Sequence, residues 1–108
     1  MLDGLWLVHF HVPATGNSRA GIILFQGTEA AGGDSTYYYA GASSIEDRCV
    51  SLALRIRKHS PGISVFGGRL TDFRLILQGK LAADNILCEG MLEHRELRLQ
   101  AKLSRLPL

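Results

Sequence analysis

Two histidines two positions apart are the residues best placed for metal chemistry in this chain. His9 and His11 lie in a run of alternating apolar residues, so in a β-strand their imidazoles project from one face and can share a metal ion. A carboxylate that would complete the ligand set is missing, because residues 13–18 contain no acid. The pair also lies opposite the face that carries Trp6. We therefore predict no metal site and interpret both histidines as surface or interface residues.

The other reactive residue types form no catalytic pattern. Cys49 and Cys88 are far apart, with no second cysteine or histidine at metal-like spacing beside either, and we expect two free, reduced thiols. No serine stands in a Gly-x-Ser-x-Gly context, and no pair of carboxylates is arranged for acid–base catalysis. The sequence predicts a protein that is not an enzyme and uses no cofactor.

Composition narrows the kind of protein further. A chain of 108 residues predicts one domain, residues 1–108, with a core large enough to fold without disulfides or metal. The net charge is +2 and the basic residues are scattered, which argues against direct nucleic-acid binding. Asp3 lies where a signal peptide would be basic, and the first apolar stretch is too short to span a bilayer. We expect a cytoplasmic protein that is not bound to a membrane.

Apolar residues recur with a period of two along most of the chain, which indicates β-strands. The alternation predicts strands near residues 5–12, 21–26, 28–31, 36–41, 49–59, 72–78, 86–92 and 97–103. We place a reversal at Gly32 and Gly33, a polar turn at residues 43–48 and a loop at residues 60–68. In that loop, Ile63, Val65 and Phe66 are able to form a brief strand that packs down as a plug.

The phase of the alternation selects the inward-facing side chains. These side chains are predicted to line an apolar interior that offers a site for a hydrophobic small molecule. They are Trp6, Phe10, Leu52, Leu54, Phe73, Leu75 and Leu99.

The second strand is apolar on both faces, which is unusual for a sheet with one wet side. We assign Ile23 and Phe25 to its outer face, beside Leu5 and Leu7 on the back of the first strand. Exposed patches of this kind usually mark an interface, so these four residues are predicted to form a homodimer contact. The alternative is that the loop at residues 63–66 covers them.

About eight strands closed into a barrel leave no free sheet edge and an interior that side chains nearly fill. We therefore predict an all-β fold, a small eight-stranded antiparallel meander barrel. The opening Gly4, Leu5 and Trp6 resemble the Gly-x-Trp start of lipocalin-type barrels, in which the indole plugs one end and a late arginine stacks over it. Arg105 falls in phase with the inward-facing residues of the last strand, so the resemblance implies that Arg105 closes the barrel over Trp6.

A longer block resembles a more specific family. Gly32, Gly33 and Asp34, followed after four residues by Tyr39, Ala40 and Gly41, are similar to the GrlR-type negative regulators of type III secretion. The likeness extends over the whole chain in the same order, through Asp3 and Gly4, Ser60 and Pro61, residues 72–75 and residues 101–103. It implies a lipocalin-like barrel that forms a homodimer, binds a partner transcriptional activator and holds it inactive.

The likeness departs from the family's pattern at one turn. Where the family's best-known regulator carries four consecutive acidic residues for contacting its activator, this chain has Ile45, Glu46, Asp47 and Arg48. The resemblance assigns partner binding to Glu46, Asp47 and Arg48, with a net charge of only one negative. Because exposed charges select partners more than they add affinity, the same activator is not implied. A solvated hairpin turn whose acids only maintain solubility is the open alternative.

Overall fold

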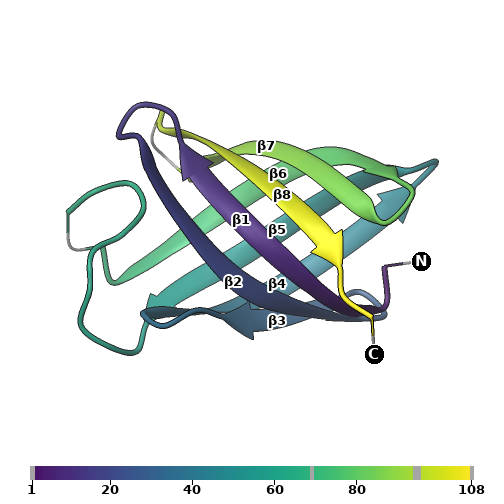
Figure 1. Cartoon of the computed structure of the whole chain (residues 1–108), viewed down its shortest axis with the longest axis horizontal. Helices are drawn as coiled ribbons and strands as arrows, with labels where there is room; N and C mark the ends of the chain where they lie inside the picture. Colours follow the sequence, from purple (N-terminus) through teal and green to yellow (C-terminus); the bar gives the residue numbers. More distant parts are fainter. Residues whose placement is uncertain (1, 69, 94–95, 108) are drawn as a thin grey trace.

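The chain forms one closed β-barrel (Figure 1). The structure is a computed structural model that describes residues 2–68, 70–93 and 96–107. Each strand pairs antiparallel with the next, and the last pairs with the first. The strands are β1 (Gly4–Val12), β2 (Asn17–Gln26), β3 (Glu29–Gly33), β4 (Tyr37–Glu46), β5 (Cys49–Lys58), β6 (Asp72–Ala82), β7 (Asn85–Leu92) and β8 (Arg98–Arg105). The predicted eight-stranded antiparallel meander is confirmed, and the described residues include no helix that is long and apolar enough to cross a membrane.

Two turns lie elsewhere than the sequence predicted. Gly32 and Gly33 belong to β3, and the reversal comes after them, where the Asp34 carboxylate accepts hydrogen bonds from the backbone N–H groups of Thr36 and Tyr37, both at 2.8 Å. An aspartate that bonds the backbone two residues on makes such a turn without glycine. The expected polar turn at residues 43–48 is mostly strand, because β4 continues to Glu46.

The interior is filled by alternate side chains from all eight strands. Of the residues predicted to line it, six are almost completely buried and Phe73 is half-buried. Aromatic rings meet edge to face, with centroids 6.1 Å apart for Trp6 and Phe25 and 5.5 Å apart for Phe10 and Tyr39. Such pairs add to the stability that burial itself provides.

The outward assignment of Ile23 and Phe25 is wrong. Both side chains are fully buried, and the backbone register sets Ile23 opposite Trp6. Residues directly opposite each other in an antiparallel pair share a face, so Ile23 faces the core together with Trp6, and its neighbours Ile22 and Leu24 face outward. The residues that lie outside beside Leu5 and Leu7 are Leu24 and Ile22. Because β2 is apolar on both faces, its own alternation did not fix which face is inside.

Four inward-facing glycines let the strands bend tightly enough to close the barrel. A methyl group at any of them would come within about 2 Å of a carbonyl oxygen on the neighbouring strand. Glycine inside a strand commonly marks such a bend or a close approach of two backbones. They are Gly32 on β3, Gly41 on β4, Gly79 on β6 and Gly90 on β7.

One end of the barrel is closed by Trp6 and Arg105. The indole is fully buried, its Nε1–H donates to the carbonyl of Leu2 at 2.8 Å, and the guanidinium of Arg105 lies 4.4 Å from the indole ring centroid. Arg105 also donates to the carbonyl of Asp3 at 2.8 Å and to the carboxylate of Asp84 at 3.1 Å. The implied stacking of Arg105 on Trp6 is therefore present, and both chain termini lie at this end (Figure 1).

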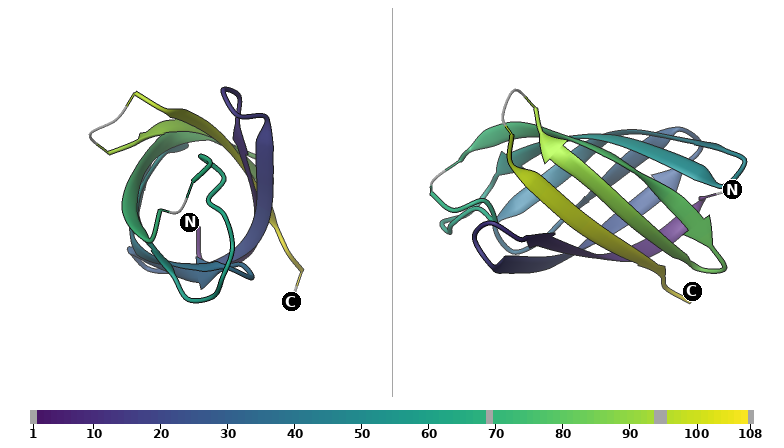
Figure 2. Two further views of the ribbon diagram at one scale, coloured as in Figure 1. Left: turned by 90° about the vertical axis from the view of Figure 1, so that its left-hand side faces the viewer. Right: turned by 90° about the horizontal axis from the view of Figure 1, so that it is seen from above.

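The loop between β5 and β6 covers the opposite end (Figure 2). Val65 and Phe66 are buried there, and the ring of Phe66 packs edge to face on Phe73 at 5.8 Å between centroids. The loop is held by side chains of the barrel, since Thr15 donates to the carbonyl of Val65 at 3.0 Å and Arg19 donates to that of Ile63. The described residues of this loop plug the barrel without forming a strand, and they leave the outer face of β1 and β2 uncovered.

Candidate binding surfaces

The barrel interior has little free space beneath the plug. The pocket there measures about 20 Å³, which is room for about one water molecule. Its wall includes Phe10, Phe73, Leu75 and Leu99 from the predicted ligand-binding set. These residues face inward as expected, but with the plug in place they pack on one another and leave no volume for a hydrophobic ligand.

A buried carboxylate organises the plugged end. Asp34 is 3% exposed and accepts hydrogen bonds from the Tyr39 hydroxyl and from two backbone N–H groups, with Arg19 Nη1 3.5 Å away. Burial, and then the bond to Asp34, raises the pKa of the Tyr39 phenol above its usual range. With its acceptor positions occupied, the carboxylate has a structural role. Sequence reasoning found Asp34 only as part of a family motif and missed this cluster, because nothing in the sequence indicates that the Asp34 side chain is buried or that Arg19 on β2 lies beside it.

The two cysteines differ sharply in environment. Cys49 is exposed and Cys88 is buried, and both are free. Burial raises the pKa of the Cys88 thiol from 9.0 to about 11. The folded protein therefore keeps this proton in a pH range where the unfolded chain has lost it.

This difference predicts a loss of stability in alkali. Between pH 9 and 11 the unfolded state binds fewer protons at Cys88 than the folded state, so the free energy of unfolding should fall as pH rises, by at most about 1.4 kcal/mol per pH unit from this group. Urea unfolding at a series of pH values measures the slope. Cys88→Ala should reduce it. An equal slope in the wild type and Cys88→Ala would contradict the assignment.

The three residues assigned to partner binding lie together at one exposed hairpin tip. Glu46 ends β4, Cys49 begins β5, and only Asp47 and Arg48 stand between them. Both have positive φ, at 50° and 67°, as a type I′ turn requires. The carbonyl of Arg48 accepts a hydrogen bond from the N–H of Leu81 at 2.8 Å, which fixes the tip against β6. The tip presents its charges to solvent on a rigid support.

The tip carries backbone strain that glycine would relieve. Asn-Gly and Asp-Gly are the preferred type I′ pairs, whereas a side chain in the left-handed region costs about 1 kcal/mol. Arg48→Gly should therefore raise the free energy of unfolding by up to about 1 kcal/mol, and Arg48→Lys should leave it unchanged. Chemical denaturation of the three proteins checks this. A destabilised Arg48→Gly protein would mean that the arginine side chain holds the turn.

The outer surface of β1 to β4 is apolar over a wide area. We call it the apolar outer face and define it by Leu5, Leu7, Ile22, Leu24, Ala31, Tyr38 and Ala40. Leu24 is 37% exposed and Tyr38 41% exposed, while Leu5 and Leu7 are half-buried. Leu24 lies opposite Leu5 on one side and Ala31 on the other, so the face is continuous across strands. A contiguous apolar surface of this kind is typical of an interface.

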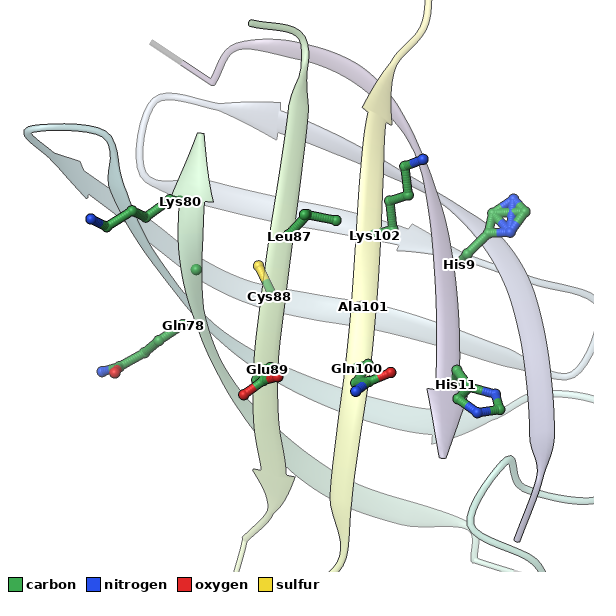
Figure 3. A pocket seen from close by; sticks show the side chains of 11 residues that line it. His9, His11, Gln78, Lys80, Leu87, Cys88, Glu89, Gln100, Ala101 and Lys102 are labelled. Atoms are coloured by element: carbon green, nitrogen blue, oxygen red, sulfur yellow. The ribbon is translucent and has the colours of Figure 1, made fainter. Parts of the chain in front are cut away.

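A second surface feature is a hollow of about 570 Å³ over β6, β7, β8 and β1 (Figure 3). His9 and His11 border it on β1, where they project outward, and His11 Nδ1 lies 2.9 Å from the Ser18 hydroxyl. Among the described residues no three histidine, cysteine or acidic side chains are grouped to hold a metal ion. The sequence did not indicate this hollow, because its lining residues come from four strands.

No protein-family model matches the chain, and no curated protein matches it. The resemblance to GrlR-type regulators therefore rests only on the sequence residues described above.

Proposed function

We propose that this protein is a cytoplasmic regulator that binds a partner transcriptional activator and holds it inactive, as the resemblance to GrlR-type negative regulators of type III secretion suggests. The observation that carries the proposal is the packed apolar interior, where the pocket beneath the plug measures only about 20 Å³, so a protein partner would bind on the outer surfaces. With no arrangement for catalysis predicted from the sequence, a protein-interaction role fits best.

The hairpin tip is the proposed contact with the activator. Glu46, Asp47 and Arg48 are exposed at this tip, where the positive φ of Asp47 and Arg48 is strained for these residue types. Strain at an exposed site is compatible with a functional role, because a stable barrel tolerates it. The mixed charge of the tip argues for a partner surface that presents both signs.

We also propose a two-fold homodimer through the apolar outer face. Leu24→Lys places a charge at its centre and should shift light scattering toward the monomer mass of 11.8 kDa. Ile76→Lys is the matched control, since Ile76 is 47% exposed but lies on β6. A monomeric wild type at high concentration would contradict the dimer.

A binder of hydrophobic small molecules is the second candidate function. The plug favours it, because Val65 and Phe66 belong to a loop and their removal would open an apolar mouth. A ligand would have to displace both side chains. This candidate therefore predicts a protein that purifies with a bound lipid or aromatic compound.

Affinity capture from the native cell lysate, followed by mass spectrometry, tests the proposed function. The wild-type protein should recover a transcriptional activator, and a variant with Glu46→Lys and Asp47→Lys should recover much less of it. Both positions are exposed at the hairpin tip, so folding is expected to be kept, and circular dichroism checks it. Recovery of no transcription factor together with a co-purifying lipid would favour the second candidate.

A further inference from the structure

The hollow in Figure 3 continues a row of side chains that begins at the hairpin tip. Opposing residues in the strand register run from Glu46 to Cys49 and on to Lys80. From Lys80 the row continues through Leu87 and Lys102 to His9. Because residues opposite each other share a face, these side chains all project outward.

The centre of this row is apolar and its flanks are cationic. Leu87 is 66% exposed, and its neighbours on the two adjacent strands are Lys80 and Lys102. Neither lysine forms an ion pair with any residue that the structure describes. Glu89 is the one acid among the residues that line the hollow. A leucine this exposed between two unpaired lysines is complementary to an apolar side chain flanked by carboxylates.

The width of the row fits a helix. Lys80 and Lys102 lie on strands β6 and β8, two strand spacings apart, which is about 10 Å. An α-helix with its side chains is about 10–12 Å across. The carboxylates along the two edges of one apolar helix face would therefore reach the two lysines, while its apolar residues covered Leu87.

We propose that the hollow over β6 to β8 docks an acidic amphipathic helix of a partner protein, with Leu87 as the apolar anchor and Lys80 and Lys102 as the charge contacts. The inference rests on the proposed function, since it specifies the chemistry of the segment that the regulated partner presents. An activator that engages the hairpin tip would reach this hollow along the same row.

A lipid membrane is the competing occupant. Lysines around an exposed leucine also suit an anionic bilayer. The two lysines are separated by about the width of one helix, and the hollow of about 570 Å³ beside them offers room for the side chains of a protein segment. The width of the row therefore favours a helix over a bilayer.

The test is an NMR titration of the whole protein with a synthetic 15-residue helical peptide that carries leucines on one face and glutamates along both edges of that face. Amide signals of Lys80, Leu87 and Lys102 should shift. Lys102→Glu and Leu87→Ser should each weaken binding about tenfold, and raising the salt concentration should weaken it further.

Matched controls separate this surface from general charge and hydrophobicity. Arg74→Glu makes the same change of charge on the outside of β6, and Ile76→Ser removes another exposed apolar side chain. Both should change the affinity by less than about twofold. A version of the peptide with lysine in place of glutamate should not bind.

Three results would overturn the proposal. The first is that the peptide shifts no amide signals of residues in the hollow. The second is that Arg74→Glu weakens peptide binding as much as Lys102→Glu does. The third is that the wild type does not respond to the peptide but binds phosphatidylglycerol vesicles, and that Lys102→Glu abolishes this vesicle binding. Other results distinguish failure of the docking surface from failure of the proposed function.

If the peptide binds but no activator is captured from the lysate, the docking surface is supported and the regulatory function is contradicted. If an activator is captured and Lys102→Glu and Leu87→Ser do not weaken its binding, the function stands and the docking surface falls.

Discussion

Gly41→Ala is expected to lower the free energy of unfolding by about 3 kcal/mol or more, although it adds only a methyl group. The added Cβ would lie 1.9 Å from the carbonyl oxygen of Ala53 and 3.0 Å from the Cα of Leu54. Both are backbone atoms of β5, so rotation of a side chain cannot relieve the clash. The two strands would have to separate where the sheet bends, and the β4–β5 hydrogen bonds would weaken there.

Gly16→Ala is the control for this prediction. Gly16 lies in the turn between β1 and β2 with no atom within 4 Å of an added Cβ, but its φ of 73° disfavours alanine. The expected cost is about 1 kcal/mol, from the backbone alone. Urea unfolding of both variants compares their losses in the free energy of unfolding. Equal losses at positions 16 and 41 would show that the close approach of β4 and β5 relaxes cheaply.

Asp34→Ala is expected to cost about 3–5 kcal/mol. The substitution removes the acceptor for two backbone N–H groups and for the Tyr39 hydroxyl, and it leaves the Arg19 guanidinium without its carboxylate. Because this cluster is buried, water does not replace the lost bonds, and unpaired polar groups are costly there. Thermal or chemical denaturation measures the loss, with the reversal before β4 and the plugged end expected to loosen first.

Asp72→Ala is the matched control. It also removes a carboxylate bound to an arginine, since Asp72 accepts two hydrogen bonds from Arg55 at 3.0 and 2.8 Å. That pair is exposed, with the Asp72 side chain 44% accessible, so solvent screens the interaction and its loss should cost far less than the loss of Asp34. If the two substitutions cost the same, the buried cluster is not the source of the stability assigned to it.

The buried cluster at Asp34 also supports the plug. The plug is held by Arg19 and Thr15, and Arg19 also faces Asp34, so loss of Asp34 should weaken the seal over the interior. If the protein bound a ligand in its interior, opening of that seal would control entry of the ligand. A regulatory function would leave it purely structural and depend on the hairpin tip and the outer surfaces.

Several features followed from the sequence by itself. Clear alternation in the fifth and last strands fixed which of their residues face inward, because a half-buried strand places its apolar side chains mainly on one side. The phase of Arg105 relative to Trp6 was also readable, since closing a meander brings its last strand beside its first. The exposed turn at Asp47 and Arg48 follows from its polar residues. The turn is shorter than the predicted range of residues 43–48, because β4 continues to Glu46.

Other features were decided only by the tertiary structure. The inward face of β2 depends on its register with Trp6, because Ile22 and Ile23 are equally apolar and only pairing distinguishes them. Whether the interior is a cavity or a packed core depends on side-chain volumes and on the plug, which lie far apart in the sequence. The row from Lys80 through Leu87 to Lys102 exists because three strands are set side by side, and the period of two within each strand carries no information about its neighbour's register.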